Sequence, residues 1–477
     1  MQADFSQDKS EAAPAGDDPK IVAFLCTWCS YAGADLAGTG RNQYPPNIRV
    51  IRVPCSGRIN PLYIIKALIE GADGVMVSGC HPGDCHYLVG NYHARRRFTV
   101  LKKLLAAAGF EQNRVHFTWV SASEGSRFAD VVKDITKKVL DLGPSPFKSD
   151  FVNTHFIDLQ LQSNDYCKNE TEQYTSFDRR SSQVNFSLLQ AQIVQHCREQ
   201  LEAGIVNTVI GYKHCEDTGN GIPCFIDSSI CSDELIWNNR CISNLAGYLL
   251  EQNGKTAIVA KPCDARAVVC FINENQLKRD DVYIIGITCF GMINSFNEPL
   301  PGCLDCKVNI PPVYDFLIDV SLIGSYEPVI GTSQSSNYSS KRFISEINKC
   351  ILCFSCRQSC YGCYCNTCFI DRTEPDWQTG SPDFGKKMLY HLGRSNHLSG
   401  RCVECGACEN ACASGVDIRY LIRSVSDFIE NTYDYRAGMS FEADPAMLSF
   451  KIDDSETGFL GFSDPEYPDI AGGYANE

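Results

Sequence analysis

The feature that most constrains this 477-residue chain is a run of four cysteines that occurs twice in its last third. The two runs are Cys350-x2-Cys353-x2-Cys356-x3-Cys360 and Cys402-x2-Cys405-x2-Cys408-x3-Cys412. Each run places three thiolates in one short loop and a fourth further along. This spacing holds paired [4Fe-4S] clusters, and the fourth cysteine of each run ligates the cluster of the other run.

We therefore expect two clusters that exchange their fourth ligands. One cluster takes Cys350, Cys353, Cys356 and Cys412, and the other takes Cys402, Cys405, Cys408 and Cys360. A pair of zinc ribbons is the alternative, since Cys-x2-Cys pairs also bind zinc. Zinc needs only two such pairs and does not explain a doubled run of four. The spacing is that of bacterial two-cluster ferredoxins, so we expect residues 341–430 to form an α+β ferredoxin-like insert.

Three further cysteines lie between the two runs, at Cys363, Cys365 and Cys368. They could begin another cluster, ligate zinc or be partly structural. No fourth ligand is visible close by, so the sequence leaves these alternatives open.

The composition argues against several classes of protein. No run of 18 apolar residues occurs, so we expect no membrane span. The net charge of −14 argues against a nucleic-acid partner. Residues 1–19 are acidic and polar and lack the apolar region of a secretory signal, so we interpret them as a disordered tail. Without an export signal, 27 cysteines favour metal ligation in a reducing cytoplasm over disulfides.

Residues 20–142 alternate predicted strands with predicted helices. The strands are Ile21–Leu25, Ile48–Val53, Gly74–Ser78 and Val115–Val120, and the helices are Pro61–Glu70, Tyr87–Ala108 and Ser126–Leu140. This order predicts an α/β domain with a small, doubly wound parallel sheet.

Five cysteines of this domain follow the ends of three strands. They are Cys26, Cys29, Cys55, Cys80 and Cys85. Because ligands bind at the carboxyl ends of parallel strands, we expect a metal cluster there. A redox-active pair made of Cys26 and Cys29 is the alternative, but it leaves the other three cysteines unexplained.

Several stretches of this domain resemble the delta subunit of methyl-viologen-reducing hydrogenase. They are Cys26–Asp35, Cys55–Arg58, Gly79–Tyr87 and Ser121–Gly125. The resemblance implies one [2Fe-2S] cluster and electron transfer to the flavin subunit of a heterodisulfide-reductase-type complex. Such a cluster needs four ligands and five cysteines are offered. The spacing does not decide whether Cys80 or Cys85 is the spare. We expect His81 and His86 to order their loops and not to ligate metal.

A second α/β region is predicted after a polar linker or arm at residues 143–189. Its predicted strands are Val206–Tyr212, Lys255–Ala260 and Val282–Ile287, with a loop at Glu216–Pro223 and a helix at Asn244–Glu251. Cys263 and Cys289 follow two of its strand ends, and Cys303 and Cys306 come after a Pro-Gly turn. They could hold a third [4Fe-4S] cluster if their loops converge; otherwise they are incidental.

Residues 190–430 resemble the beta subunit of deazaflavin-coenzyme-reducing hydrogenase and of related formate dehydrogenases. The motifs are Val209–Tyr212, Leu235–Asn238, Cys241–Ala246, Lys261–Arg266 and Arg394–Cys402. The resemblance implies FAD beside iron–sulfur clusters in residues 190–340. The candidate flavin contacts are Arg240, Asn244, Lys261, Asp264 and Arg266, each of which could equally be a packing residue.

The chain ends in a predicted helix, Tyr420–Asn431, and an acidic tail, residues 431–477, whose aromatic residues suggest docking. We interpret the chain as an iron–sulfur flavoprotein subunit. It would pass electrons between a hydride donor, or a hydrogenase or formate dehydrogenase subunit, and a heterodisulfide-reductase-like complex that could bifurcate electrons. Two alternatives stay open. One is a self-contained flavin oxidoreductase of deazaflavin coenzyme or NAD(P)H, and the other is a flavin-free iron–sulfur relay or sensor.

Overall fold

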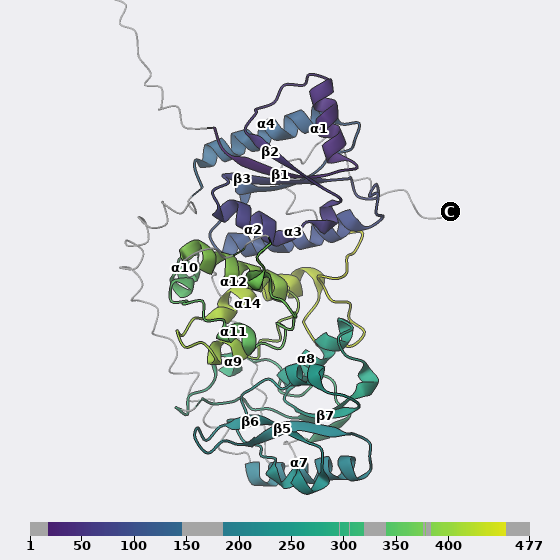
Figure 1. Ribbon diagram of the computed structural model, residues 1–477, viewed down its shortest axis with the longest axis vertical. Coiled ribbons are helices and arrows are strands. Elements are labelled where there is room, and N and C mark those ends of the chain that lie inside the picture. Colours follow the sequence, from purple (N-terminus) through teal and green to yellow (C-terminus); the bar gives the residue numbers. More distant parts are fainter. Residues whose placement is uncertain are drawn as a thin grey trace, which may run out of the picture.

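The protein forms three stacked layers: a parallel sheet with its helices, a middle layer of helices, and a second sheet (Figure 1). We describe it from a computed structural model. The structure describes residues 18–145, 185–294, 296–304, 306–318, 340–374, 377 and 383–454. The predicted N-terminal tail therefore lies almost wholly outside the described residues.

The first sheet has four parallel strands in the order β2-β1-β3-β4. They are β1 (Ile21–Cys26), β2 (Ile48–Val53), β3 (Gly74–Gly79) and β4 (Val115–Trp119). Helices α1 (Ser30–Thr39) and α4 (Gly125–Leu142) cover one face, and α2 (Pro61–Ile69) and α3 (Gly90–Ala107) cover the other (Figure 1). The predicted strands and the doubly wound arrangement are confirmed.

Each face of this sheet has its own hydrophobic core. Val131 and Ile135 of α4 pack with Leu25 on one face, while Leu62 of α2 and Leu104 of α3 belong to the core on the other. Both faces are buried, which is why β1 and β3 are almost continuously apolar in sequence.

Helix α1 was not predicted, because Gly33 and Gly38 lower its helix propensity. The structure shows why one of these glycines is needed. A Cβ on Gly33 would lie 2.7 Å from the carbonyl oxygen of Ser121, so only glycine lets α1 pack this closely against the loop after β4.

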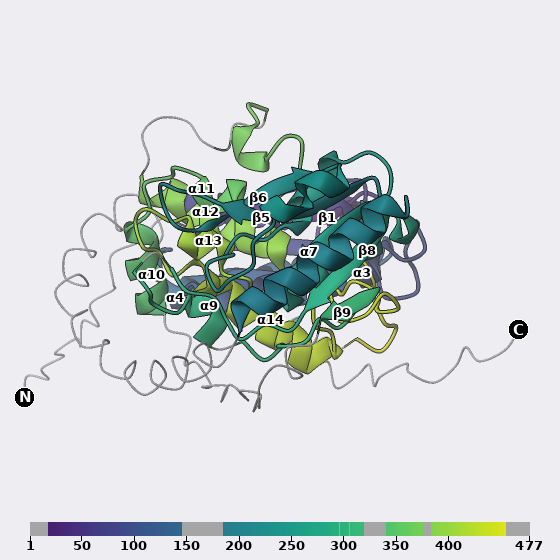
Figure 2. The same ribbon diagram turned by 90° about the horizontal axis from the view of Figure 1, so that it is seen from below.

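The second sheet has the strand order β6-β5-β7-β8-β9. Its strands are β5 (Thr208–His214), β6 (Gly221–Ile226), β7 (Thr256–Ala260), β8 (Val282–Ile287) and β9 (Phe316–Ile318). Only β6 is antiparallel. Helix α7 (Phe186–Glu202) covers the outer face (Figure 2), and α8 (Pro262–Asn273) lies between the sheet and the helical layer (Figure 1).

The predicted helical stretch is present, as a 3₁₀ helix at Ala246–Glu251. Two other predictions for this region were wrong in detail. Strand β6 begins inside the predicted loop, because Gly221 pairs with His214 and continues a hairpin with β5. Helix α7 begins at Phe186, within the predicted linker, and residues 146–184 of that linker lie outside the described residues.

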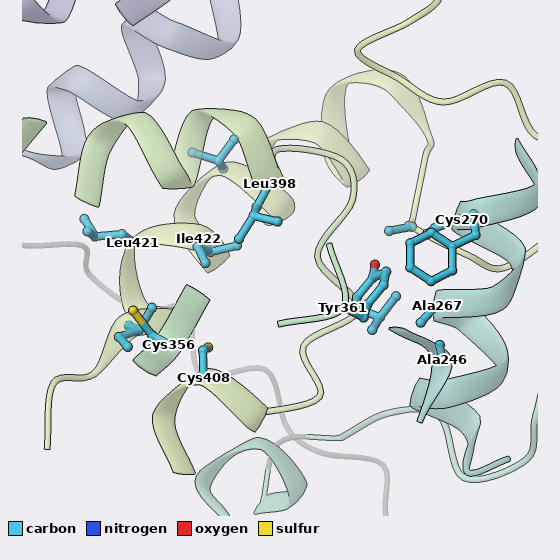
Figure 3. Packing of buried hydrophobic residues seen from close by; sticks show 14 of the residues in the cluster. Ala246, Ala267, Cys270, Cys356, Tyr361, Leu398, Cys408, Leu421 and Ile422 are labelled. Atoms are coloured by element: carbon cyan, nitrogen blue, oxygen red, sulfur yellow. The ribbon is translucent and has the colours of Figure 1, made fainter. Parts of the chain in front are cut away.

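The middle layer contains α10 (Ser340–Asn348), α11 (Ser355–Gln358), α12 (Phe384–Leu398), α13 (Ala407–Asn410) and α14 (Ile418–Tyr433). No β-strand occurs in the described part of residues 340–454, so this segment is helical and not α+β as expected. Leu398 and Leu421 pack above the short helices that carry Cys356 and Cys408 (Figure 3). The long helices thus supply the core, and the cysteine loops need no sheet to support them.

After α14 the chain returns to the first domain through residues 445–454, which we call the strap. Arg96 of α3 donates two hydrogen bonds of 2.7 Å to the Asp454 carboxylate, and both side chains are buried. Phe450 stacks on Tyr92, with ring centroids 5.2 Å apart. The described start of the predicted docking tail therefore packs on this chain itself, and residues 455–477 lie outside the described residues. Within the described ranges no helix has both the length and the apolarity to cross a bilayer.

Candidate metal centres

Three thiols meet at the carboxyl edge of the first sheet. Cys26 ends β1, Cys29 precedes α1, and Cys80 follows β3. Their sulfur atoms all lie within 4.8 Å of one another, and all three side chains are buried. The neighbouring parallel strands β1 and β3 end at the same edge, which is why residues so distant in sequence meet here.

The other two cysteines of this domain form a pair beside the three. The Sγ atoms of Cys55 and Cys85 are 3.8 Å apart, and Cys55 also lies within hydrogen-bond reach of Cys26. Helix α3 begins at Gly90, where a Cβ would lie 2.6 Å from the sulfur of Cys55. The structure thus brings all five predicted thiols together and places Cys80, not Cys85, in the tight group of three.

The crowding of these thiols perturbs their ionisation. Hydrogen bonds from Cys26 and Cys29 lower the pKa of Cys80 to about 4. Cys29 donates hydrogen bonds to Cys26 and Cys80, and these bonds raise the pKa of Cys29. The thiols of such a group cannot all be deprotonated together unless a cation binds among them, because neighbouring thiolates repel one another. The donor set therefore suits iron held by thiolates.

The two histidines of these loops engage residues other than cysteine. His81 Nε2 lies 2.8 Å from Glu124 Oε2, and Glu124 also accepts a hydrogen bond of 2.6 Å from the Ser121 amide. The His86 ring stacks on Trp28, with centroids 3.8 Å apart. Both contacts order the loops around the thiols.

The two cysteine runs of the helical layer have the same backbone conformation. Leu352 and Phe354 of the first run have φ values of 55° and 62°, and Glu404 and Gly406, at equivalent positions, have 59° and 75°. Left-handed backbone in a non-glycine residue costs of order 1–3 kcal/mol and persists where the surroundings impose it.

This conformation turns backbone amides toward the thiols. The amide of Leu352 lies 3.3 Å from Cys350 Sγ, and the amide of Glu404 lies 3.4 Å from Cys402 Sγ. Amides placed in this way stabilise thiolate ligands. The repetition of the same turn shows that each loop is shaped for the same kind of ligand.

The fourth cysteine of each run lies near thiols of the other run. Burial raises the pKa of Cys402 and Cys405 to about 12, and the nearby Cys360 thiol contributes to both shifts. Burial likewise raises the pKa of Cys350, with Cys356 and Cys412 adding to it. These are neighbours that an exchange of fourth ligands requires.

Among the described residues, only Cys26, Cys29 and Cys80 form a set of three ligand atoms that all lie within 4.8 Å of one another. The described thiols of the two runs are less compact than this group.

A third group of thiols lies at the carboxyl edge of the second sheet. One cavity of about 50 Å³ is lined by Cys263, Cys289, Cys303 and Cys306, and also by Cys405 of the second run. The amide of Met292 lies 3.3 Å from Cys303 Sγ, and the amide of Gly291 lies 3.4 Å from Cys289 Sγ. The three loops therefore converge, and their cavity adjoins the second run.

The three cysteines between the runs do not gather into one group. Cys363 lies beside Cys360, Cys368 lies beside Arg357, and Cys365 is exposed. As described, they offer no common ligand site.

The five candidate flavin contacts form hydrogen bonds or ion pairs with other residues of this chain. Asp264 accepts hydrogen bonds from the amides of Leu245 and Lys261 and pairs with the Lys261 ammonium at 2.9 Å. Arg266 donates to the carbonyl oxygens of Ala437 and Val403.

The remaining two candidates have partners as well. Asn244 accepts from the Ala246 amide and lies 3.4 Å from the carbonyl oxygen of Cys263, and Arg240 donates to Asn297. Lys261 and Arg266 line the cavity described above, but the other three candidates do not. The five residues therefore do not form one open site for FAD, and we derive no step through it.

Sequence reasoning missed two residues of α12 that face the cysteine runs. The Tyr390 hydroxyl lies 3.2 Å from Cys356 Sγ, and Arg394 donates a hydrogen bond of 3.1 Å to the carbonyl oxygen of Cys356. They are four residues apart and so share one helix face. No local pattern marks them, because only the fold brings α12 to the cysteine runs.

Comparisons with known proteins agree with the first of these sites. The family model for "Methyl-viologen-reducing hydrogenase, delta subunit" matches residues 21–143. An iron-sulfur subunit of the vhc F420-non-reducing hydrogenase from Methanococcus voltae is 55% identical over 141 residues, which are 30% of this chain and 96% of that protein. The corresponding subunit from Archaeoglobus profundus is 52% identical over 131 residues, 28% of this chain and 96% of that protein.

A protein of another kind is also similar. One subunit of the ferredoxin:CoB-CoM heterodisulfide reductase from Methanosarcina mazei is 44% identical over 152 residues. The match covers 31% of this chain and 19% of that protein. These similar proteins are all components of oxidoreductases.

Proposed function

Because the chain belongs, through residues 21–143, to the family of the delta subunit of methyl-viologen-reducing hydrogenase, we propose that it relays electrons between a donor enzyme and a heterodisulfide-reductase-type complex. The chain is an iron–sulfur subunit of an oxidoreductase. The observation that carries the proposal is the buried five-thiol site in the matched domain.

The matched domain holds a [2Fe-2S] cluster in this proposal. Its ligands are Cys26, Cys29, Cys55 and Cys80, because Cys55 is within reach of Cys26 while Cys80 lies in the tight group of three. Cys85, whose close sulfur neighbour is Cys55, is the spare thiol.

The rest of the chain holds three [4Fe-4S] clusters in this proposal. Cys350, Cys353, Cys356 and Cys412 bind one, Cys402, Cys405, Cys408 and Cys360 bind another, and Cys263, Cys289, Cys303 and Cys306 bind the third. Such clusters supply one-electron carriers when bound. The chain's own residues bury the thiolates, donate backbone amides to sulfur and exclude water, which together tune the reduction potential.

Two of the thiol groups adjoin each other. Cys405 belongs to the second run and also lines the cavity of Cys263 and Cys289. At the other end of the helical layer Cys353 is exposed, which gives the first run access to the surface. This continuity favours a relay over a sensor, because one cluster would be enough for sensing.

The partners that this proposal names are of two kinds. One is the flavin subunit of a heterodisulfide-reductase-type complex, bifurcating or not, and the other is a hydrogenase or formate dehydrogenase catalytic subunit. This choice of partners is supported by the similar proteins, which are subunits of hydrogenases and of heterodisulfide reductases. The described cysteines are all free thiols, which favours a reducing cytoplasm.

Oxidation of a hydride donor by this chain itself has less support. The resemblance of residues 190–430 to beta subunits implies FAD and such a donor. The five candidate contacts, however, bind other groups of this chain. We therefore assign hydride chemistry to a partner protein.

Rapid mixing tests the proposal. The chain, purified with its clusters and reduced by dithionite, is mixed with the flavin subunit of a heterodisulfide reductase. We expect the iron–sulfur absorbance to show oxidation coupled to flavin reduction, and Cys80→Ser to slow this step at least tenfold. Oxidation that the flavin subunit does not accelerate would contradict the proposal.

A further inference from the structure

A buried arginine of the helical layer is unlike the other buried arginines near the thiols. Arg394 of α12 is 4% exposed. No carboxylate of the described residues pairs with it, and its Nε has no hydrogen-bond acceptor among them. By contrast, Arg419 pairs with Glu409 at 2.6 Å, and Arg96 pairs with Asp454 at 2.7 Å.

Four cysteines lie around Arg394. Its Nη2 donates a hydrogen bond of 3.1 Å to the carbonyl oxygen of Cys356. The side chain also lies within hydrogen-bond reach of the thiols of Cys360 and Cys363. Cys408 is the fourth neighbouring thiol.

These neighbours come from both cysteine runs. Cys356 is a ligand in the first proposed cluster, while Cys360 and Cys408 are ligands in the second. The guanidinium therefore lies between the two ligand sets. The nearby His391, on the same helix, has its pKa lowered to about 3 by burial and by Arg394, so it is neutral and does not share this role.

Burying a cation without an anionic partner is strongly unfavourable. The environment of Arg394 is favourable only when the sulfurs around it carry negative charge, as thiolate-ligated clusters do. A fixed positive charge at that place stabilises the reduced, more negative state of each cluster. Net charge and hydrogen bonds to sulfur are known determinants of cluster potential.

We propose that Arg394 is a positioning residue that raises the reduction potentials of both [4Fe-4S] clusters of the helical layer, and that of the Cys402–Cys405–Cys408 cluster more. The inequality follows from its neighbours. Two ligands of the second cluster, but only one of the first, lie beside it. The inference rests on the proposed function, since it requires both clusters.

The test is a reductive titration followed by EPR on the cluster-loaded full chain. Arg394→Gln removes the charge, and Arg342→Gln removes an exposed arginine that pairs with Asp417 on the same layer. We expect Arg394→Gln to lower both potentials, the second by an equilibrium factor of about ten, or about 59 mV for one electron. Arg342→Gln should change neither reduction potential by more than a small fraction of that shift.

Unchanged potentials in an Arg394→Gln protein that keeps its iron would overturn the inference. If Arg394→Gln loses iron, Arg394→Lys decides the question. Retention of both clusters by the lysine variant shows that the charge is what they need, and loss in both variants shows that Arg394 serves packing alone. A wild-type chain without cubane signals would instead refute the proposed function, so the two failures are distinguishable.

Discussion

At the level of single residues, the thiols of this chain depend on neighbours that carry no chemistry of their own. Gly90 leaves room for the sulfur of Cys55, and the amides of Leu352 and Glu404 point at Cys350 and Cys402. Ligand identity alone therefore does not define these sites. Backbone conformation around each cysteine decides which sulfurs can share one cluster.

The spare thiol of the first domain gives a prediction at this scale. Cys80→Ser should abolish the [2Fe-2S] signal, because Cys80 lies in the tight group with Cys26 and Cys29. Cys85→Ser is the matched variant and should retain it. EPR of the reduced proteins and iron analysis measure both. A retained signal in Cys80→Ser together with a lost signal in Cys85→Ser would reverse our assignment.

A second residue-scale prediction concerns the start of α3. Gly90→Ala forces a methyl group toward the sulfur of Cys55, and overpacking of this kind costs about 1–3 kcal/mol. We expect a lower [2Fe-2S] content and a lower melting temperature. Gly38→Ala in α1 is the control, since nothing lies within 4 Å of its new Cβ, and it should be neutral or stabilising by up to about 1 kcal/mol.

At the level of elements, the sequence predicted those strands whose positions depend on the local pattern of residues. Strands β1, β2, β3 and β4 lie where their apolar runs indicated, and β8 has the predicted bounds. Both sheets place cysteines at their carboxyl edges, as the order of strands implied. These features follow from local propensity and from the geometry of parallel strands.

Other elements could not be predicted because tertiary packing overrides propensity. Helix α1 contains two glycines and is fixed by its contact with the loop after β4. Strand β6 exists because it pairs with β5, and its sequence carries a proline at Pro223. The role of Arg394 was also hidden, since only the fold brings α12 between the two cysteine runs.

At the level of the whole molecule, the strap packs residues 445–454 against α3 of the first domain. The Arg96–Asp454 pair is buried, so loss of one partner leaves an uncompensated charge. Asp454→Asn should weaken strap docking by about 3 kcal/mol. Hydrogen exchange of residues 445–454 should then accelerate about a hundredfold.

Asp453→Asn is the control for this variant, since Asp453 is exposed, and it should leave the exchange unchanged. Burial alone would raise the pKa of Asp454, but the hydrogen bonds from Arg96 outweigh it and hold this pKa below its usual value. The contribution of Asp454 is therefore present above about pH 4 and is lost as the pH falls through the folded-state pKa. Equal exchange in both variants would show that the pair does not hold the strap.

The separation between the layers gives another prediction. Cys405→Ser should remove one cubane and interrupt electron flow, while the [2Fe-2S] spectrum of the first domain stays intact. Cys405 also lines the cavity of the third thiol group, so the EPR signal of that cluster should shift. If the cubane and [2Fe-2S] signals vanished together, the division of the chain into separate modules would be wrong.

The most direct test of the central claim is the iron, acid-labile sulfide, zinc and flavin content of anaerobically purified protein, with EPR of the reduced state. Three cubanes and one [2Fe-2S] cluster predict about fourteen irons for each chain. Zinc in the two cysteine runs, with iron absent from them, would contradict the account.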